Sequence, residues 1–110
     1  MAKSLPIPAV ARRDPKSVEM VRTWIANGDL FVVLNIGFWE QQQRNIDERD
    51  AWGILMADMA RHVANAHETE YGRDPRETLQ LIREAFEREI LKPTSSHSGR
   101  FVKNRDPNAS

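Results

Sequence analysis

The stretch from Ile46 to Tyr71, IDERDAWGILMADMARHVANAHETEY, restricts the fold of this chain more than any other part of the sequence. Asp47 is a typical N-cap, and Gly72 can take the left-handed conformation that ends a helix. At 100° per residue, one face of the helix collects six apolar side chains. They are Trp52, Leu55, Met56, Met59, Val63 and Ala66. The stretch therefore predicts a long amphipathic helix.

A second helix is predicted directly after the first. In Asp74-Pro75, the aspartate suits the N-cap and the proline suits the first helical position. Apolar residues then recur at helical spacing until Pro93, at Leu79, Ile82, Phe86 and Ile90. The short link through Gly72 and Arg73 makes the two helices antiparallel neighbours.

A β-hairpin is predicted before these helices. Asn27-Gly28 separates two runs of β-branched and aromatic residues, and this dipeptide favours the type I′ turn because both central residues need positive φ. A turn placed there pairs Ile25 with Leu30, Thr23 with Val32 and Val21 with Leu34. A helix over residues 15–26 is the alternative, because Val18, Val21, Trp24 and Ile25 also fit a 3.6-residue period.

These elements predict an α+β fold, in which a β-hairpin is followed by two antiparallel amphipathic helices (ββαα) with flexible termini. Residues 1–17 are expected to form an extended or flexible arm, since Pro6 and Pro8 fix φ and remove amide donors. Residues 18–92 are expected to form a single α+β domain. Residues 93–110, rich in Ser, Asn, Gly and charge, are expected to form a disordered basic tail.

The composition is that of a globular protein, with 40% hydrophobic and 29% charged residues. The net charge of zero conceals basic ends, because residues 1–16 and 92–110 each carry +3 and residues 17–91 carry −6. An acidic body repels a nucleic-acid backbone, so we expect no nucleic-acid partner. There is no cysteine, no secretory signal and no apolar run near the roughly 18 residues of a membrane span. We expect a bacterial cytoplasmic protein.

The hairpin is expected to carry an interaction surface. The helices can cover the face that holds Ile25 and Leu30, which leaves an apolar face of Met20, Trp24, Phe31 and Val33. Both strand edges are also open. A symmetric homodimer, formed by strand pairing or by face packing, would cover these groups. The alternative is that the N-terminal arm folds over the face.

Three runs of the sequence resemble a small proteobacterial family that is catalogued as a domain of unknown function. The runs are VRTWIANGDLFVVLNIGFW, DERDAWGILMADMARHVANA and LQLIREAFEREI, and the most specific piece is AWGILMADMARHVA. The resemblance covers about residues 18–91. It implies a short α+β bacterial protein and attaches no activity, cofactor or catalytic residue.

Asp58, His62 and Asn65 form the best polar constellation, at positions i, i+4 and i+7 on one flank of the first long helix. An aspartate one turn before a histidine can orient the imidazole for binding or for proton transfer. An ordinary surface pair at the same spacing is the alternative. Trp39, beside a polar loop, is a further candidate for ligand binding.

Motifs for nucleotide, metal-protease or serine-hydrolase chemistry are absent from the sequence, so we expect no enzyme, no cofactor and no metal. The sequence predicts a small homodimeric protein-interaction or regulatory domain. The alternative is a small-molecule or metal-binding module that uses the Asp58/His62 flank.

Overall fold

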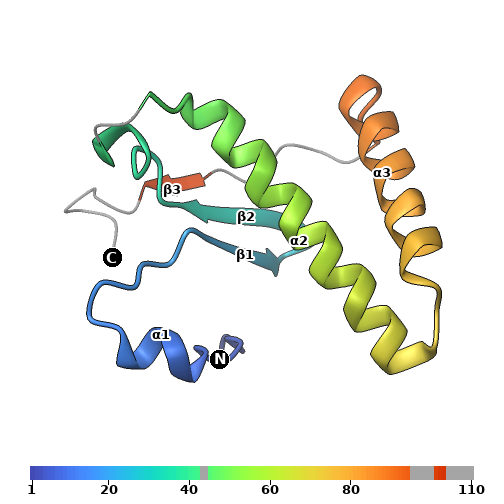
Figure 1. The fold of residues 1–110 in the computed structure, drawn as a ribbon, viewed down its shortest axis with the longest axis horizontal. Helices are drawn as coiled ribbons and strands as arrows, with labels where there is room; N and C mark the ends of the chain where they lie inside the picture. The colour runs from blue at the N-terminus through green and yellow to red at the C-terminus, as the bar shows by residue number, and fades with distance from the viewer. Residues whose placement is uncertain (43–44, 95–100, 104–110) are drawn as a thin grey trace. The chain divides into compact units, whose positions relative to one another are not determined.

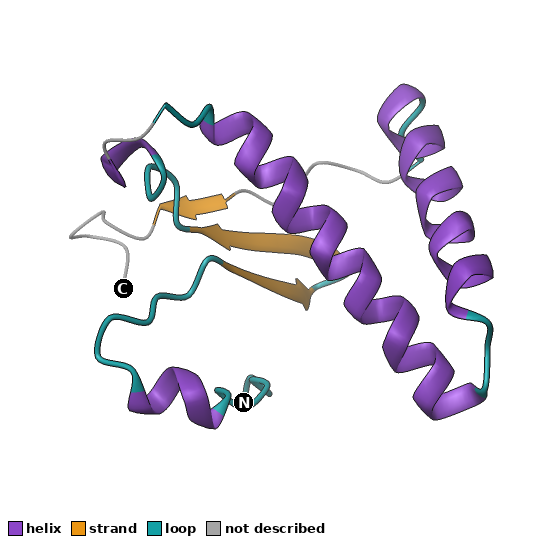
Figure 2. Ribbon diagram, viewed as in Figure 1, coloured by secondary structure: helices purple, strands orange, loops and turns teal. Residues whose placement is uncertain are grey.

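The computed structural model describes residues 1–42, 45–94 and 101–103 of the 110-residue chain. The chain divides into two compact units, Met1–Ile36 with Ser98–Ser110, and Gly37–His97. The boundary at Gly37 falls inside the region that the sequence analysis treated as one domain, residues 18–92. In order, the elements are one short helix, a hairpin, a 3-10 turn, two long helices and a short strand (Figures 1 and 2).

The hairpin of the first unit confirms the predicted strands and their register. Strand β1 (Val21–Ala26) pairs antiparallel with β2 (Asp29–Leu34), and Ile25 lies opposite Leu30 as expected from the turn. Asn27 and Gly28 have φ of 52° and 76°, as a type I′ turn requires. Residues 21–26 are therefore a strand, and the alternative of a helix there is wrong.

A third strand, β3 (Phe101–Lys103), pairs parallel with β2 and gives the sheet order β1-β2-β3 (Figure 1). This strand lies within residues 93–110, which were expected to form a disordered basic tail, an expectation that stays a prediction. The pairing is set by backbone groups of residues distant in the chain, which no local pattern reports. Residues 95–100 and 104–110 of that tail lie outside the described residues.

Helix α1 (Ala9–Arg13) lies within residues 1–17, which were expected to form an extended or flexible arm. Pro8 stands in the N-cap position, and alanine and arginine are good helix formers. Asp14 is the C-cap, and its carboxylate accepts a hydrogen bond from the backbone N–H of Lys16 (2.9 Å). The helix has five residues and ends before Asp14-Pro15, because proline disfavours a helical conformation in the residue before it.

The second unit contains the 3-10 turn η1 (Glu40–Gln42) and the two predicted helices, α2 (Glu48–Tyr71) and α3 (Pro75–Leu91). Asp47 caps α2 and Asp74 caps α3, because each carboxylate accepts the backbone N–H two residues later, both at 2.9 Å. Gly72 ends α2 with φ 68°. The helices meet at this link and diverge from it (Figure 1).

Few side chains are buried in the described part of the chain. The buried apolar residues are Ala51 and Ala64, and the buried polar residues are Asn35 and Glu48. No residue of α3 is buried, although its apolar stripe lies where the sequence predicted it. Neither long helix has the length and apolar character of a membrane span, and the same holds for the other helices in the described ranges.

Candidate functional site

The most developed polar site of the second unit is built around the carboxylate of Glu48, the first residue of α2. This residue is 7% exposed, and the structure surrounds its two oxygens with N–H donors. Oε2 accepts from the backbone N–H of Gly37 (2.9 Å) and from Trp52 Nε1 (3.4 Å). Oε1 accepts from the backbone N–H of Trp39 (3.1 Å) and of Glu40 (3.3 Å). The carboxylate therefore holds the segment before η1 against the start of the helix.

The local sequence explains how this site forms. Gly37 has φ 95°, a region that favours glycine, and the bend there turns its N–H toward the helix. The N-terminus of α2 also favours a negative charge, because its first N–H groups have no partner within the helix. Glu48 thus receives donors from a loop and lies at the positive end of a helix dipole.

These hydrogen bonds set the charge state of Glu48. The bond from Gly37 is the largest cause that lowers its pKa below the ordinary value of 4.5, and the bonds from Glu40, Trp52 and Trp39 act in the same direction. Burial alone would raise the pKa, so hydrogen bonding to the charged form outweighs desolvation. The group is ionised at neutral pH, and its four donors leave it poorly suited to proton transfer.

Three aromatic rings pack beside this carboxylate. Trp39 meets Trp52 edge to face, with ring centroids 5.4 Å apart and planes at 84°. Phe38 meets Trp39 in a similar way at 5.6 Å and 79°. Trp39, a predicted ligand-binding residue, is half-buried in this cluster, and its backbone N–H is one of the donors to Glu48. These contacts give Trp39 a packing role in the loop.

The predicted constellation on α2 lies on the surface. Asp58, His62 and Asn65 are all exposed, and the Asp58 carboxylate pairs with Arg61 (2.7 Å). The structure places the three residues on one flank of the helix, as their spacing requires, while Asp58 takes a different partner from the predicted His62. In the described residues, His, Cys, Asp and Glu side chains form no group of three or more that could hold a metal ion. A ligand at this flank stays a prediction.

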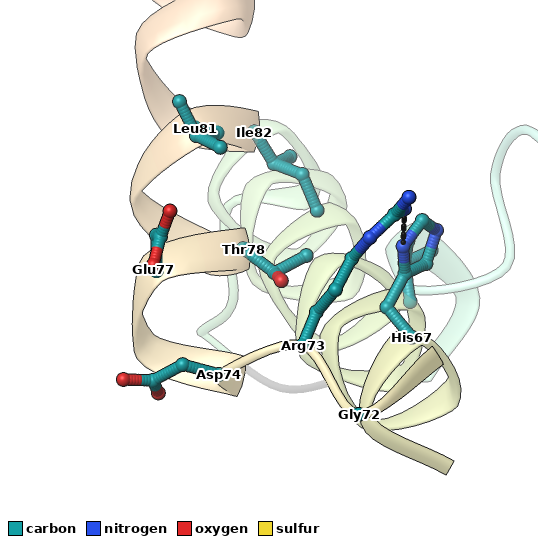
Figure 3. A pocket seen from close by; sticks show the side chains of 9 residues that line it. His67, Gly72, Arg73, Asp74, Glu77, Thr78, Leu81 and Ile82 are labelled. Carbon is teal, nitrogen blue, oxygen red and sulfur yellow. Dashed lines mark hydrogen bonds between the residues drawn. The ribbon is translucent and has the colours of Figure 1, made fainter. Parts of the chain in front are cut away.

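A hollow of about 640 Å³ lies at the elbow between α2 and α3 (Figure 3). Arg73 Nη1 lies 2.9 Å from His67 Nδ1, and the Arg73 guanidinium lies 4.6 Å from the centre of the Tyr71 ring. Thr78 and Ile82 extend from α3 on the side of Arg73 and His67, whereas Asp74 and Glu77 extend on the other side (Figure 3). The hollow is thus mixed in character, with a cationic group at its end and apolar walls along the helices.

Sequence reasoning missed Glu48 as a site residue. Three of its four donors are backbone N–H groups of residues 8 to 11 positions earlier in the chain, which helical periodicity does not reveal. The available signal was a glycine, Gly37, after a predicted strand, followed by an acidic helix start. That signal does not specify which of Asp47, Glu48 and Asp50 turns inward.

The comparisons with known proteins identify relatives. One similar solved structure is that of "a putative pyruvate dehydrogenase from the photosynthetic bacterium Rhodopseudomonas palustrus CGA009", at 27% sequence identity and a TM-score of 0.60. The match covers 87% of this chain and 91% of that chain. No curated protein matches. The profile of one family, described as Domain of unknown function (DUF5076), matches residues 4–94. The chain therefore belongs to the family Domain of unknown function (DUF5076).

Proposed function

We propose that this chain is a small homodimeric protein-interaction or regulatory domain. The observation that carries the proposal is the exposure of the apolar stripes on both long helices. Phe86 is 52% exposed and Ile90 66%, and on α2 Met56, Met59 and Val63 are 44–48% exposed. Amphipathic helices normally bury such stripes, and an exposed one is typical of an interaction surface.

The free energy that burial of these exposed side chains would release supports a partner. Full burial of an aliphatic or aromatic side chain stabilises by about 1.5–3 kcal/mol, so five that are half exposed leave about 4–7 kcal/mol unused in each chain. Two chains together leave about 8–14 kcal/mol, which is within the range of about 4–15 kcal/mol that association costs. A dimer that covers these residues is therefore energetically reasonable, and flanking contacts would decide its affinity.

The hairpin supplies further apolar surface. The predicted interface residues Met20, Trp24, Phe31 and Val33 are half-buried, whereas on the opposite face Ile25 is 83% exposed and Leu30 is 52% exposed. The outer edge of β1 is unpaired in the described sheet, whose order is β1-β2-β3. Both faces and the edge of the hairpin thus stay candidates for the second part of an interface.

An enzymatic function has less support. The name pyruvate dehydrogenase is that of the protein in the similar structure. In this chain the buried carboxylate of the described residues, Glu48, is occupied by four donors. A bacterial origin is supported by the source of the similar structure, and a cytoplasmic location remains part of the proposal.

Native mass spectrometry of gently purified protein tests the proposal. The expected spectrum shows a dimer without additional mass. A monomer at all concentrations up to the high micromolar range would contradict the homodimer. A reproducible adduct would favour the alternative ligand-binding function, and the Asp58 and His62 variants would then be compared for loss of that mass.

A further inference from the structure

We propose that the hollow at the elbow between α2 and α3 binds a small monocarboxylate with an apolar body, of the size of a short-chain fatty acid. This inference goes beyond the proposed homodimer and does not rest on it. The hollow is lined from within the second unit, by a cationic group, a hydroxyl and apolar walls (Figure 3).

The cationic group is Arg73, and side chains of α2 hold it in place. A guanidinium has donors and no acceptor, so Arg73 Nη1 donates to His67 Nδ1 across 2.9 Å. The guanidinium also lies 4.6 Å from the centre of the Tyr71 ring, and the rings of His67 and Tyr71 are 5.4 Å apart. Arg73 is therefore oriented before a ligand arrives, which reduces the entropy cost of binding.

Arg73 retains donors for a ligand. A guanidinium has several N–H groups, and His67 accepts from one nitrogen. No carboxylate among the described residues lies within ion-pair distance of Arg73. A bound carboxylate would accept the charge-assisted hydrogen bonds that a guanidinium favours.

Thr78 provides a second polar group, from α3. Its half-buried side chain extends on the side of Arg73 and His67 (Figure 3). Within the described ranges its hydroxyl has no hydrogen-bond partner, and the oxygen is not sealed from solvent. Because a hydroxyl can donate to a carboxylate oxygen, Thr78 and Arg73 can hold the same ligand group.

The walls of the hollow require an apolar body in the ligand. Val63 of α2 and Ile82 of α3 both line it, and its volume is about 640 Å³. Sites for small molecules usually measure about 300–1,000 Å³ and combine apolar walls with a few polar groups. A hydrocarbon chain that lies along Val63 and Ile82 would remove apolar surface from water.

The surrounding charges restrict the ligand to one negative charge. The unit Gly37–His97 has eight Lys and Arg against twelve Asp and Glu side chains, a net charge of −4. Asp74 and Glu77 also line the hollow, but they extend on the side away from Arg73 (Figure 3). Exposed charges more than about 8 Å apart are largely screened at physiological ionic strength, so Arg73 acts at short range. Each further negative charge on the ligand is disfavoured by the acidic unit, which excludes phosphate and dicarboxylates as good ligands.

A ligand series on the wild-type chain tests the site, with acetate, butyrate and hexanoate as probes in NMR titrations. We expect saturable shifts of the backbone amides that line the hollow, those of Val63, Gly72 and Thr78. A fully buried methylene strengthens binding about fourfold, and the walls bury it only in part, so hexanoate should bind about tenfold more tightly than acetate. Hexanamide has the same chain without the charge and should bind about tenfold more weakly than hexanoate.

Three substitutions assign the binding to its residues. We expect Arg73→Gln to weaken hexanoate binding by about tenfold, and Thr78→Val, which removes the hydroxyl at nearly constant size, to weaken it by about fivefold. Arg76→Gln is the matched control, because this arginine is 94% exposed in its side chain and does not line the hollow. Its dissociation constant should remain within about twofold of the wild type.

The outcomes that would overturn the site are distinct. One is the absence of saturable shifts at the hollow with all three carboxylates, and another is hexanamide or phosphate that binds as tightly as hexanoate. Equal losses in Arg73→Gln and Arg76→Gln would show attraction by general positive charge and would also overturn it. Because the ligand series uses the wild-type chain alone, it decides the question even where a variant fails to fold.

Discussion

At the scale of single residues, Glu48 is the polar side chain on which the second unit depends most. Replacement by Gln keeps its size, but a neutral amide accepts at one oxygen only, so some of the four donors lose their partner. We expect Glu48→Gln to lower the free energy of unfolding by about 1–3 kcal/mol. Urea denaturation followed by tryptophan fluorescence measures the change.

The matched control is Asp50→Asn, which removes an exposed charge from the same first turn of α2. Only a helix-dipole contribution is lost there, of about 0.3–1 kcal/mol. Equal losses for the two variants would show that Glu48 acts only through its charge at the helix end.

The same residue predicts a dependence of stability on pH. Its folded pKa is lowered from 4.5 mainly by the Gly37 bond, so its contribution is fully present above the unfolded value. That contribution is lost as pH falls below about 4.5 and through the lowered folded pKa. We expect the difference in unfolding free energy between the wild type and Glu48→Gln to shrink over this range.

Other carboxylates titrate in the same acid range, so the comparison with the variant is necessary. The hydrogen bonds from Arg49 lower the pKa of the exposed Asp47 to about 2. Glu89, which accepts from Thr94, also has a lowered pKa. Asp47 and Glu89 are present in both the wild type and Glu48→Gln. Their contributions therefore cancel in the difference between the two unfolding free energies. A difference that stays constant from pH 7 to pH 3 would contradict the role assigned to Glu48.

At the scale of elements, Gly53 offers a test within α2. Nothing lies within 4 Å of the position that a Cβ would take there. Glycine in a helix interior costs about 1 kcal/mol relative to alanine, so we expect Gly53→Ala to raise the free energy of unfolding by about 0.5–1 kcal/mol. Chemical denaturation at a fixed protein concentration measures the gain.

At Gly37, in contrast to Gly53, replacement by alanine is expected to destabilise the fold. The φ of 95° at Gly37 strains any residue with a Cβ, although the nearest atom, Gln41 Nε2, is 3.9 Å away. We expect Gly37→Ala to destabilise. If Gly53→Ala also destabilises, the expected gain from helix propensity is contradicted.

The sequence predicted those elements whose limits are set by local chemistry. Asn27-Gly28 sets the turn and hence the whole register of β1 with β2, while Asp47, Gly72 and Asp74 set the ends of the helices. Strand β3 could not be predicted, because its parallel pairing with β2 joins residues about seventy positions apart through backbone groups.

The candidate site was only partly predictable, because its contacts also join residues that a local sequence pattern does not connect. Trp39 was predicted to bind a ligand from its residue type and its place beside a polar loop, and that role stays a prediction; the structure places it in the cluster around Glu48. The inward position of Glu48 depends on the bend at Gly37, and a periodic pattern contains no information on such a bend. Burial was the least predictable feature, since Ile25 was expected to be covered and is 83% exposed.

At the scale of the whole molecule, the described residues include few buried apolar side chains. Ala51 and Ala64 are the buried apolar residues, and alanine has little side-chain surface to remove from water. Because ordering a chain costs about 1–2 kcal/mol per residue in backbone entropy, a folded domain needs larger buried side chains. The large apolar residues that could supply this burial, such as Met59 and Phe86, remain about half exposed.

If a second copy buries these side chains, folding and dimerisation are linked by mass action. The apparent melting temperature of the wild-type chain should then rise with protein concentration, because association favours the folded state. Phe86→Glu should melt at a temperature that does not depend on concentration, because it places a charge in the exposed stripe of α3. Ile54 is similarly exposed (57%) but lies on the face of α2 opposite Met59, so Ile54→Glu should behave as the wild type does. Circular dichroism at 222 nm over a hundredfold range of concentration measures this. A wild-type melting temperature that is constant over that range would show that each chain reaches its stability alone and would contradict the homodimer.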